Sequence, residues 1–164
     1  MTDIIFCKKC LTPNSRPRIV FDKNNICNAC INAIEKKRIS WKKREQEFLK
    51  IIDKIKKDKN KNQSYDCIVP WSGGKDSSSI AIKLKKYGLR PLLVTFSPLL
   101  INEIGSHNRE ILINKGFDSL FFRPDQNVAK KLAKRFFIER GNPKIAWDAG
   151  VMSIPVKMAI NFNI

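Results

Sequence analysis

The segment Tyr65–Trp71 is a short apolar run that ends at the turn Ser72–Ser77, and a helical pattern follows over Asp76–Tyr87. The run has the length of a buried strand, and Gly73-Gly74 marks a turn, so the order strand, turn, helix is predicted. Glycines let the backbone adopt positive φ and approach an anion closely. The amides that open a helix have no partner within it, and the helix dipole favours negative charge there. This unit therefore predicts an α/β fold with an anion-binding turn.

The same alternation of strand and helix continues to the end of the chain. Further strands are expected at Pro91–Phe96 and Ser119–Phe122, and further helices at Glu103–Lys115, Gln126–Arg140 and Met152–Phe162, with Pro155 in the first turn of the last helix. The alternation predicts a parallel sheet with helices on both faces and a ligand beyond the carboxyl ends of its strands. Three strands are fewer than the ~5–6 of an average sheet. We therefore expect a truncated chain, the alternative being a small sheet that dimerises.

Four of the five cysteines form the pattern C-x₂-C-x₁₆-C-x₂-C. The ligands are Cys7, Cys10, Cys27 and Cys30. This spacing predicts a four-thiolate zinc site, with an iron–sulfur cluster as the alternative because it uses the same ligands. Four protein ligands leave no open position, so the metal is expected to be structural. The fifth cysteine, Cys67, lies in a predicted strand and is interpreted as a small buried hydrophobe.

Three regions follow from these patterns. Residues 1–30 form the cysteine module, residues 31–62 a basic amphipathic helix and linker, and residues 63–164 an incomplete α/β domain. In the middle region Trp41, Phe48, Ile52 and Ile55 recur at nearly helical spacing between charged residues.

Composition restricts the setting of the protein. Hydrophobic residues make up 43% of the chain, enough for a packed core. No stretch reaches the ~18–20 apolar residues that a membrane span needs, and the N-terminus lacks an export signal, so a cytoplasmic protein without membrane partners is expected. The net charge is +17. Because that charge is spread along the chain, a solvated basic surface is favoured over a dedicated nucleic-acid face.

Each residue of the turn offers chemistry suited to phosphate. Ser72 and Ser77 bring hydroxyl donors, Gly73 and Gly74 close backbone approach, and Lys75 a counter-charge, while Asp76 either holds Mg²⁺ or caps the helix. The pattern G-x-x-x-x-G-K-[ST] of a Walker loop is missing. The alternative is a plain glycine turn before an N-capped helix.

The turn Ser72-Gly73-Gly74-Lys75-Asp76-Ser77 after a buried strand resembles the signature of the PP-loop ATP pyrophosphatases. Further segments resemble the N-acetyl sugar amidotransferases of surface-polysaccharide (lipopolysaccharide, O-antigen) synthesis. These segments are the two cysteine pairs, Tyr65–Pro70, Lys86–Leu89, Pro91–Phe96, Glu103–Gly105 with Asn108, and Gly116–Asp118. Such enzymes split ATP between its α- and β-phosphates, adenylate the oxygen of a sugar's N-acetyl group and let ammonia displace AMP, which leaves an acetamidino group.

The resemblance implies a role for each matching residue. Ser72, Gly73, Gly74, Lys75, Asp76 and Ser77 would hold the pyrophosphate end of ATP. Asp76 and Lys75 would be the catalytic residues, with Asp76 assisting Mg²⁺. Thr95, Phe96 and Ser97 would lie beside adenine and ribose. The substrate would be a nucleotide-linked sugar, and the cofactors ATP, Mg²⁺ and Zn²⁺.

Two features depart from the family. Members carry Cys and His residues where this chain has Asn142–Asp148. They are also longer, which agrees with truncation. ATP binding by this chain is therefore better supported than turnover by this chain alone. The only histidine is His107, expected to be a surface or capping residue, with a substrate contact as the alternative. Because glutamine hydrolysis usually needs a Cys nucleophile with a His base, a separate glutaminase subunit is expected to supply ammonia.

Two other functions remain open. One is a tRNA-modifying PP-loop enzyme of the thiolation type, which also combines a zinc module with this loop and would use the basic surface for tRNA. Its sulfur chemistry needs further cysteines, and only Cys67 is spare. The other is a truncated, inactive fragment that binds a nucleotide or a partner.

Overall fold

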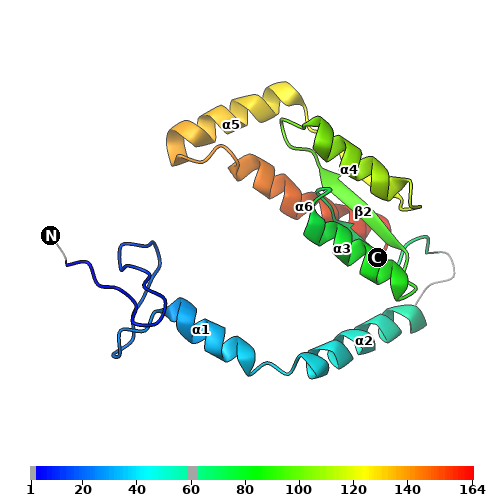
Figure 1. Cartoon of the computed structure of the whole chain (residues 1–164). Coiled ribbons are helices and arrows are strands. Elements are labelled where there is room, and N and C mark those ends of the chain that lie inside the picture. Colours follow the sequence, from blue (N-terminus) through cyan, green and yellow to red (C-terminus); the bar gives the residue numbers. More distant parts are fainter. Residues whose placement is uncertain (1–2, 59–62) are drawn as a thin grey trace. The chain divides into compact units, whose positions relative to one another are not determined.

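The computed structural model describes residues 3–58 and 63–164 (Figure 1). The chain forms two compact units, Met1–Leu49 and Lys50–Ile164, and each is considered by itself. Within the described residues the fold is mixed α/β, with six helices and one three-stranded sheet.

The first unit is built around the cysteine pairs. Two isolated antiparallel bridges, Phe6 with Pro13 and Phe21 with Cys27, close its loops. Cys7, Cys27 and Cys30 are buried at its centre, and the side chains of Ile19, Phe21 and Ile26 pack around them. The buried centre of this unit therefore consists of cysteine side chains with a few apolar residues around them.

Two helices occupy the region from which one helix was expected. Helix α1 spans Asn28–Lys37 and helix α2 spans Trp41–Lys57. The prediction of a single helix from residue 31 was wrong because Ser40 begins a new one. Its hydroxyl accepts a hydrogen bond from the Lys43 N–H at 3.4 Å, as an N-cap does. The end of the predicted region, residues 59–62, lies outside the described residues.

The second unit contains the sheet. Strands β1 (Cys67–Pro70), β2 (Pro91–Phe96) and β3 (Ser119–Phe122) lie in the order β1-β2-β3. Both pairings are parallel, with Val69 opposite Leu93 and Val94 opposite Leu120. The prediction of an α/β fold with a parallel sheet is confirmed at this level.

Four helices accompany the sheet. They are α3 (Lys75–Lys86), α4 (Glu103–Ile113), α5 (Gln126–Arg140) and α6 (Ile145–Asn161). Successive strand residues point to opposite faces. On one face Val69 and Leu93 join Ala81 of α3 and Leu112 of α4 in the main hydrophobic core. On the other face Phe96 contacts α6 at Gly150, so helices cover both faces of the sheet (Figure 1).

Helix α6 begins at Ile145, well before the predicted start at Met152. Pro155 therefore lies inside the helix and not in its first turn, which corrects the prediction. A proline inside a helix removes one hydrogen bond to the preceding turn. Packing outweighs this cost here, because Pro155 is buried and α6 contacts both β1 and β2.

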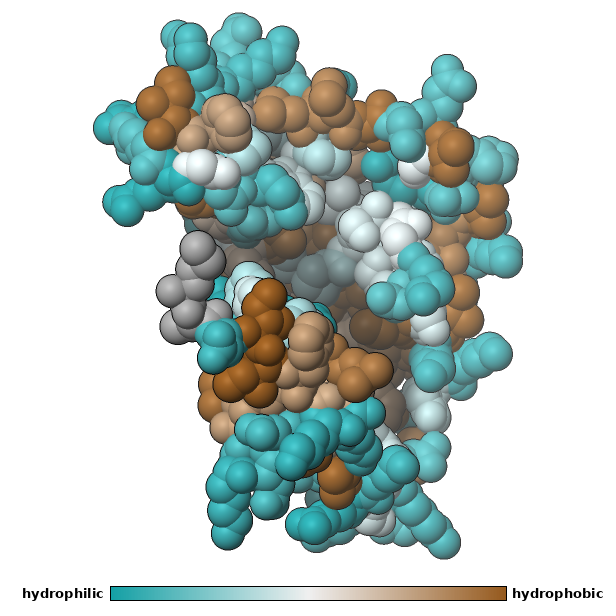
Figure 2. Space-filling view, turned by 60° about the vertical axis from the view of Figure 1, so that its left-hand side comes forward, coloured by the Kyte–Doolittle hydropathy of each residue, from teal (hydrophilic) through white to brown (hydrophobic). Residues whose placement is uncertain are grey.

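Hydrophilic residues and exposed large apolar side chains share the surface, and the face in Figure 2 shows the apolar ones in several groups between hydrophilic regions. Within residues 3–58 and 63–164, every helix is too short or too polar to cross a bilayer.

Candidate functional site

The turn Ser72–Ser77 connects the carboxyl end of β1 to the start of α3. Trp71 anchors this junction. Its backbone N–H donates to the Val94 carbonyl at 2.8 Å, and its indole Nε1 donates to the Ser78 hydroxyl at 3.0 Å. Because Trp71 is buried, the strand end and the first turn of the helix are held together beneath the loop.

The loop leaves the start of α3 free of protein caps. Gly73 has a φ of +79°, which turns the backbone sharply. The Ser72 hydroxyl accepts the Gly74 N–H at 3.3 Å, and the Ser77 hydroxyl donates to the Gly74 carbonyl at 3.3 Å. Gly74 is the N-cap residue, and no side chain caps the helix. The first amides of α3 therefore have no partner within the helix and can receive an anion.

Lys75 and Asp76 extend from this end of the helix into solvent. Their side chains are 91% and 90% exposed and form a loose ion pair, with Lys75 Nζ 3.6 Å from Asp76 Oδ1. An ion pair this exposed is weak, so both groups can reorient toward a ligand. Their placement is compatible with the predicted roles in phosphate and Mg²⁺ binding, which remain predictions.

A pocket of about 250 Å³ opens beside the loop. It lies at the carboxyl ends of β1 and β2, the position expected for a ligand site in a parallel sheet. Its polar lining comes from Ser72, Thr95 and Arg109. Two tryptophans, Trp71 and Trp147, also line it. Its apolar walls include Val94, Phe96, Val151 and Pro155.

Arg109 is a component of this site that the sequence analysis missed. It comes from α4, and a Cβ placed on Gly73 would lie only 2.9 Å from Arg109 Cγ. Its guanidinium carbon lies 4.9 Å from the centre of the Phe121 ring, and one of its nitrogens donates to the Ser106 hydroxyl at 3.3 Å. Among the described residues no carboxylate forms an ion pair with it. The loop therefore has a half-buried positive charge beside it.

No sequence signal distinguishes Arg109 from the many other basic residues of the chain. Its importance comes from a tertiary contact between α4 and the loop, which local patterns do not encode. The helix start itself was predictable, because Asn102 caps α4 by accepting the Gly105 N–H at 2.7 Å.

The three residues predicted to lie beside the nucleotide are distributed over two pockets. Thr95 and Phe96 line the loop pocket, whereas Ser97, together with Phe96, lines an adjoining one. The hydroxyl of Thr95 donates to the Trp71 carbonyl, and that of Ser97 donates to the Pro98 carbonyl at 3.0 Å. Both serve the fold of the strand end in this structure, so the aromatic ring of Phe96 is the group most directly offered to a ligand.

Two other positions singled out in the sequence have local roles. His107 is exposed on α4 and does not line either pocket. In the segment that departs from the family pattern, Asn142 accepts the Lys144 N–H at 2.9 Å just before α6, and Trp147 forms a wall shared by the two pockets.

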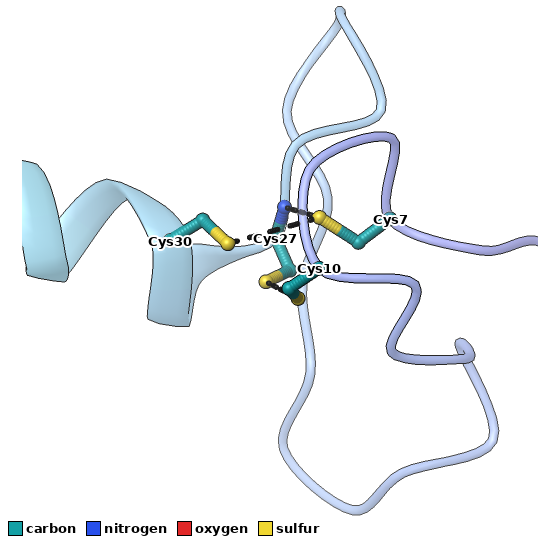
Figure 3. Close-up of side chains that lie close together, drawn as sticks. All are labelled: Cys7, Cys10, Cys27 and Cys30. Carbon is teal, nitrogen blue, oxygen red and sulfur yellow. Dashed lines mark hydrogen bonds between the residues drawn. The ribbon is translucent and has the colours of Figure 1, made fainter.

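The second candidate site is the group of four cysteines in the first unit (Figure 3). All four sulfur atoms lie within 4.8 Å of one another, and the Sγ atoms of Cys7 and Cys30 are 4.0 Å apart, those of Cys10 and Cys27 3.6 Å apart. The predicted ligands Cys7, Cys10, Cys27 and Cys30 are thus brought together from two loops and the start of α1. The group could hold a metal ion.

Backbone amides polarise this group. Burial raises the pKa of Cys7, but N–H groups of Cys27, Cys10 and Lys9 donate to its sulfur and together lower the pKa to about 6. The Cys27 and Lys9 amides are 3.3 and 3.4 Å from that sulfur. A hydrogen bond with the Thr12 hydroxyl lowers the pKa of Cys10. In Cys30, hydrogen bonding to Cys10, followed by burial, raises the pKa to about 12.

Cys67 has a different environment. Burial and then the nearby charge of Asp66 raise its pKa to about 11. Its thiol is therefore protonated near neutral pH and a poor nucleophile. It lies at the amino end of β1, whereas the glycine loop follows the carboxyl end of that strand.

A scan against protein-family models finds no match to the chain, and a search of curated proteins finds none with significant similarity. The assignment of function therefore rests on the residues and geometry of the two sites.

Proposed function

We propose that residues 63–164 bind ATP as a PP-loop domain and that the chain is an ATP-dependent N-acetyl sugar amidotransferase of surface-polysaccharide synthesis. The observation that carries this proposal is the loop Ser72–Ser77, which follows a parallel strand and leaves the start of α3 uncapped. The resemblance of the loop and its flanking segments to that family supplies the reaction.

Pyrophosphate would bind where three favourable features meet. The free amides and dipole of α3 attract negative charge. Gly73 lets the backbone approach closely, and Ser72 and Ser77 add hydroxyl donors. Arg109 brings a planar guanidinium that suits phosphate oxygens, and it is not neutralised by a described carboxylate. These features all stabilise the charge of a departing pyrophosphate.

The reaction balances around the acetamido oxygen. That oxygen attacks the α-phosphorus, the bond to the β-phosphate oxygen breaks, and pyrophosphate leaves with the electron pair. Ammonia then adds to the activated carbon, and the carbon–oxygen bond breaks to release AMP, which keeps the original acetamido oxygen. The product is an acetamidino group. The exposed Asp76 carboxylate is the group that would hold Mg²⁺, whose charge neutralises the phosphates when it is bound.

The four cysteines would hold one Zn²⁺ ion. Thiolate–zinc bonds of ~2.3 Å in a tetrahedron place sulfur atoms roughly 3.8 Å apart. The Cys7–Cys30 and Cys10–Cys27 sulfur separations, 4.0 and 3.6 Å, bracket that value, and all four sulfurs lie within 4.8 Å of one another. A cluster of several iron atoms would spread its ligands farther than a single ion does, so the compact arrangement favours a mononuclear site. With four protein ligands the metal stabilises the fold and takes no part in the reaction.

The chain would receive ammonia from a separate glutaminase subunit in the cytoplasm. Among the described residues no thiol is paired with the histidine. His107 is exposed on α4, and Cys67 lies at the amino end of β1, away from the glycine loop. The high pKa of Cys67 also disfavours the thiolation alternative, which needs a reactive cysteine.

Two measurements test the proposal. On this chain, ATP and pyrophosphate should compete for one site, which equilibrium binding measures directly. With the glutaminase partner and any further segment of the enzyme present, ¹⁸O placed in the acetamido group of a nucleotide-linked sugar should appear in AMP. Recovery of the label in inorganic phosphate or water, with none in AMP, would contradict the mechanism.

A further inference from the structure

A second pocket, of about 170 Å³, adjoins the loop pocket. It lies beyond the carboxyl ends of β2 and β3 and beneath α5 and α6. Its apolar lining residues are Phe96, Leu99, Pro124, Val128, Ala129, Leu132, Ala133, Pro143, Ala146 and Trp147. Ser97 and Asp125 are the other two lining residues.

The two polar lining residues other than Trp147 have hydrogen-bond partners within the fold. The Ser97 hydroxyl donates to the Pro98 carbonyl at 3.0 Å, and Asp125 Oδ1 accepts the amides of Asn127 and Val128 at 2.9 Å each as the cap of α5. The Trp147 Nε1 atom is buried and has no hydrogen-bond partner among the described residues, so this wall offers one unused donor. A sugar or a nucleobase has several polar groups and would find one unused donor here, so it would lose most of its hydrogen bonds on entering, whereas a hydrocarbon group would lose none.

The two pockets share one wall, formed by Phe96 and Trp147. The ring of Phe96 is held from two sides. It stacks on Phe122 with ring centres 5.7 Å apart, and a Cβ placed on Gly150 would lie 2.3 Å from it, so α6 approaches it as closely as only glycine allows. A ligand that fills the apolar pocket can therefore present its next atoms at a fixed edge beside the loop pocket.

We propose that this pocket binds the hydrocarbon part of the acyl group whose carbonyl oxygen is adenylated. The inference rests on the proposed function and defines its acceptor. A cavity of ~150 Å³ with apolar walls is large enough for benzene, so this one is larger than a methyl group requires. The acceptor amide is thus not restricted to acetyl, and acyl chains of up to about six carbons fit.

The test compares two probes, hexanamide and acetamide. Their dissociation constants for the full chain are measured by NMR titration. Hexanamide should bind at least tenfold more tightly than acetamide, because its additional methylene groups leave water. Ala129→Leu and Ala133→Leu each fill the pocket and should remove that difference. Ala149→Leu is the matched control, since Ala149 is exposed on α6 and lines neither pocket, and it should keep the difference.

Pyrophosphate binding to the same variants separates the two claims. It should be unchanged in all three. The acyl pocket is overturned if hexanamide binds the unmodified chain no more tightly than acetamide, or if its tighter binding persists in both filled variants, while pyrophosphate binding is retained. If the unmodified chain does not bind pyrophosphate, the proposed function is contradicted. The comparison of hexanamide with acetamide still decides whether the acyl pocket exists.

Discussion

Gly73→Ala tests the conformation of the loop most sharply. An alanine at a φ of +79° is strained, and its Cβ would lie 2.9 Å from Arg109 Cγ, which must then move. The left-handed conformation costs a residue with a Cβ roughly 1–2 kcal/mol. For a domain of this size we expect the melting temperature to fall by about 4–8 °C.

Two other glycines supply the controls. Gly141 has a φ of +66° and nothing within 4 Å of a Cβ, so Gly141→Ala has backbone strain alone. Gly74 has a φ of −77°, and its Cβ would meet only the Ser72 hydroxyl at 3.1 Å, so Gly74→Ala should change stability by less than about 0.5 kcal/mol. Both controls keep the arginine in place.

The assay combines thermal unfolding with calorimetric titration of pyrophosphate. Gly73→Ala and Gly141→Ala should both destabilise the protein, but only Gly73→Ala should weaken pyrophosphate binding, by about tenfold, since one charge-assisted hydrogen bond contributes roughly 1.5–3 kcal/mol. The reasoning is refuted if Gly73→Ala is as stable as Gly74→Ala, or if it binds pyrophosphate as the unmodified chain does.

Further predictions concern the metal group, the wall shared by the two pockets and the half-buried thiol of Cys67. Cys30→Ser should lower bound zinc from about one ion per chain to below half, as metal analysis of the purified protein measures, while pyrophosphate binding stays intact; iron in place of zinc would contradict the assignment. Zinc binding at pH 8 should release fewer than four protons. Cys7, with a pKa of about 6, is already a thiolate, whereas Cys30, with a pKa of about 12, must lose a proton. Calorimetry in buffers of different ionisation enthalpy counts the protons released, and a release of four would contradict the prediction. Gly150→Ala would place a Cβ 2.3 Å from the Phe96 ring. It should lower the free energy of unfolding by about 1–3 kcal/mol, as chemical denaturation measures, and an unchanged denaturation midpoint would contradict this. Alkylation of Cys67 should accelerate up to about pH 11, where its raised pKa lies, and a plateau already at pH 9 would disagree.

The sequence predicted those parts of the fold that have local markers. The bounds of β2, β3 and α5 match the expectation, because Pro91, the turn after Phe122 and the Asp125 cap delimit them. The cysteine group was equally predictable, since its two C-x₂-C pairs need only fold back on each other.

The remaining features depend on tertiary packing. The start of α6 at Ile145 was missed because Gly150 and Pro155 both weaken a helical pattern, and only contact with the sheet explains their presence. Arg109 was missed because its position beside Gly73 depends on how α4 packs into the core that it shares with α3 and the sheet. The second pocket likewise requires α5 and α6 to be placed together over the strand ends.

The central claim is that the loop Ser72–Ser77 binds the phosphates of ATP with the help of Arg109. The most direct measurement is calorimetric titration of ATP into the zinc-loaded chain, with and without excess pyrophosphate, alongside Arg109→Gln and the control Arg140→Gln on the exposed surface of α5. We predict one ATP per chain, competition by pyrophosphate, a loss of about tenfold or more in Arg109→Gln and no change in Arg140→Gln. A folded, metal-loaded chain that binds ATP no more tightly than the Arg109→Gln variant, or whose ATP is not displaced by pyrophosphate, would contradict the account.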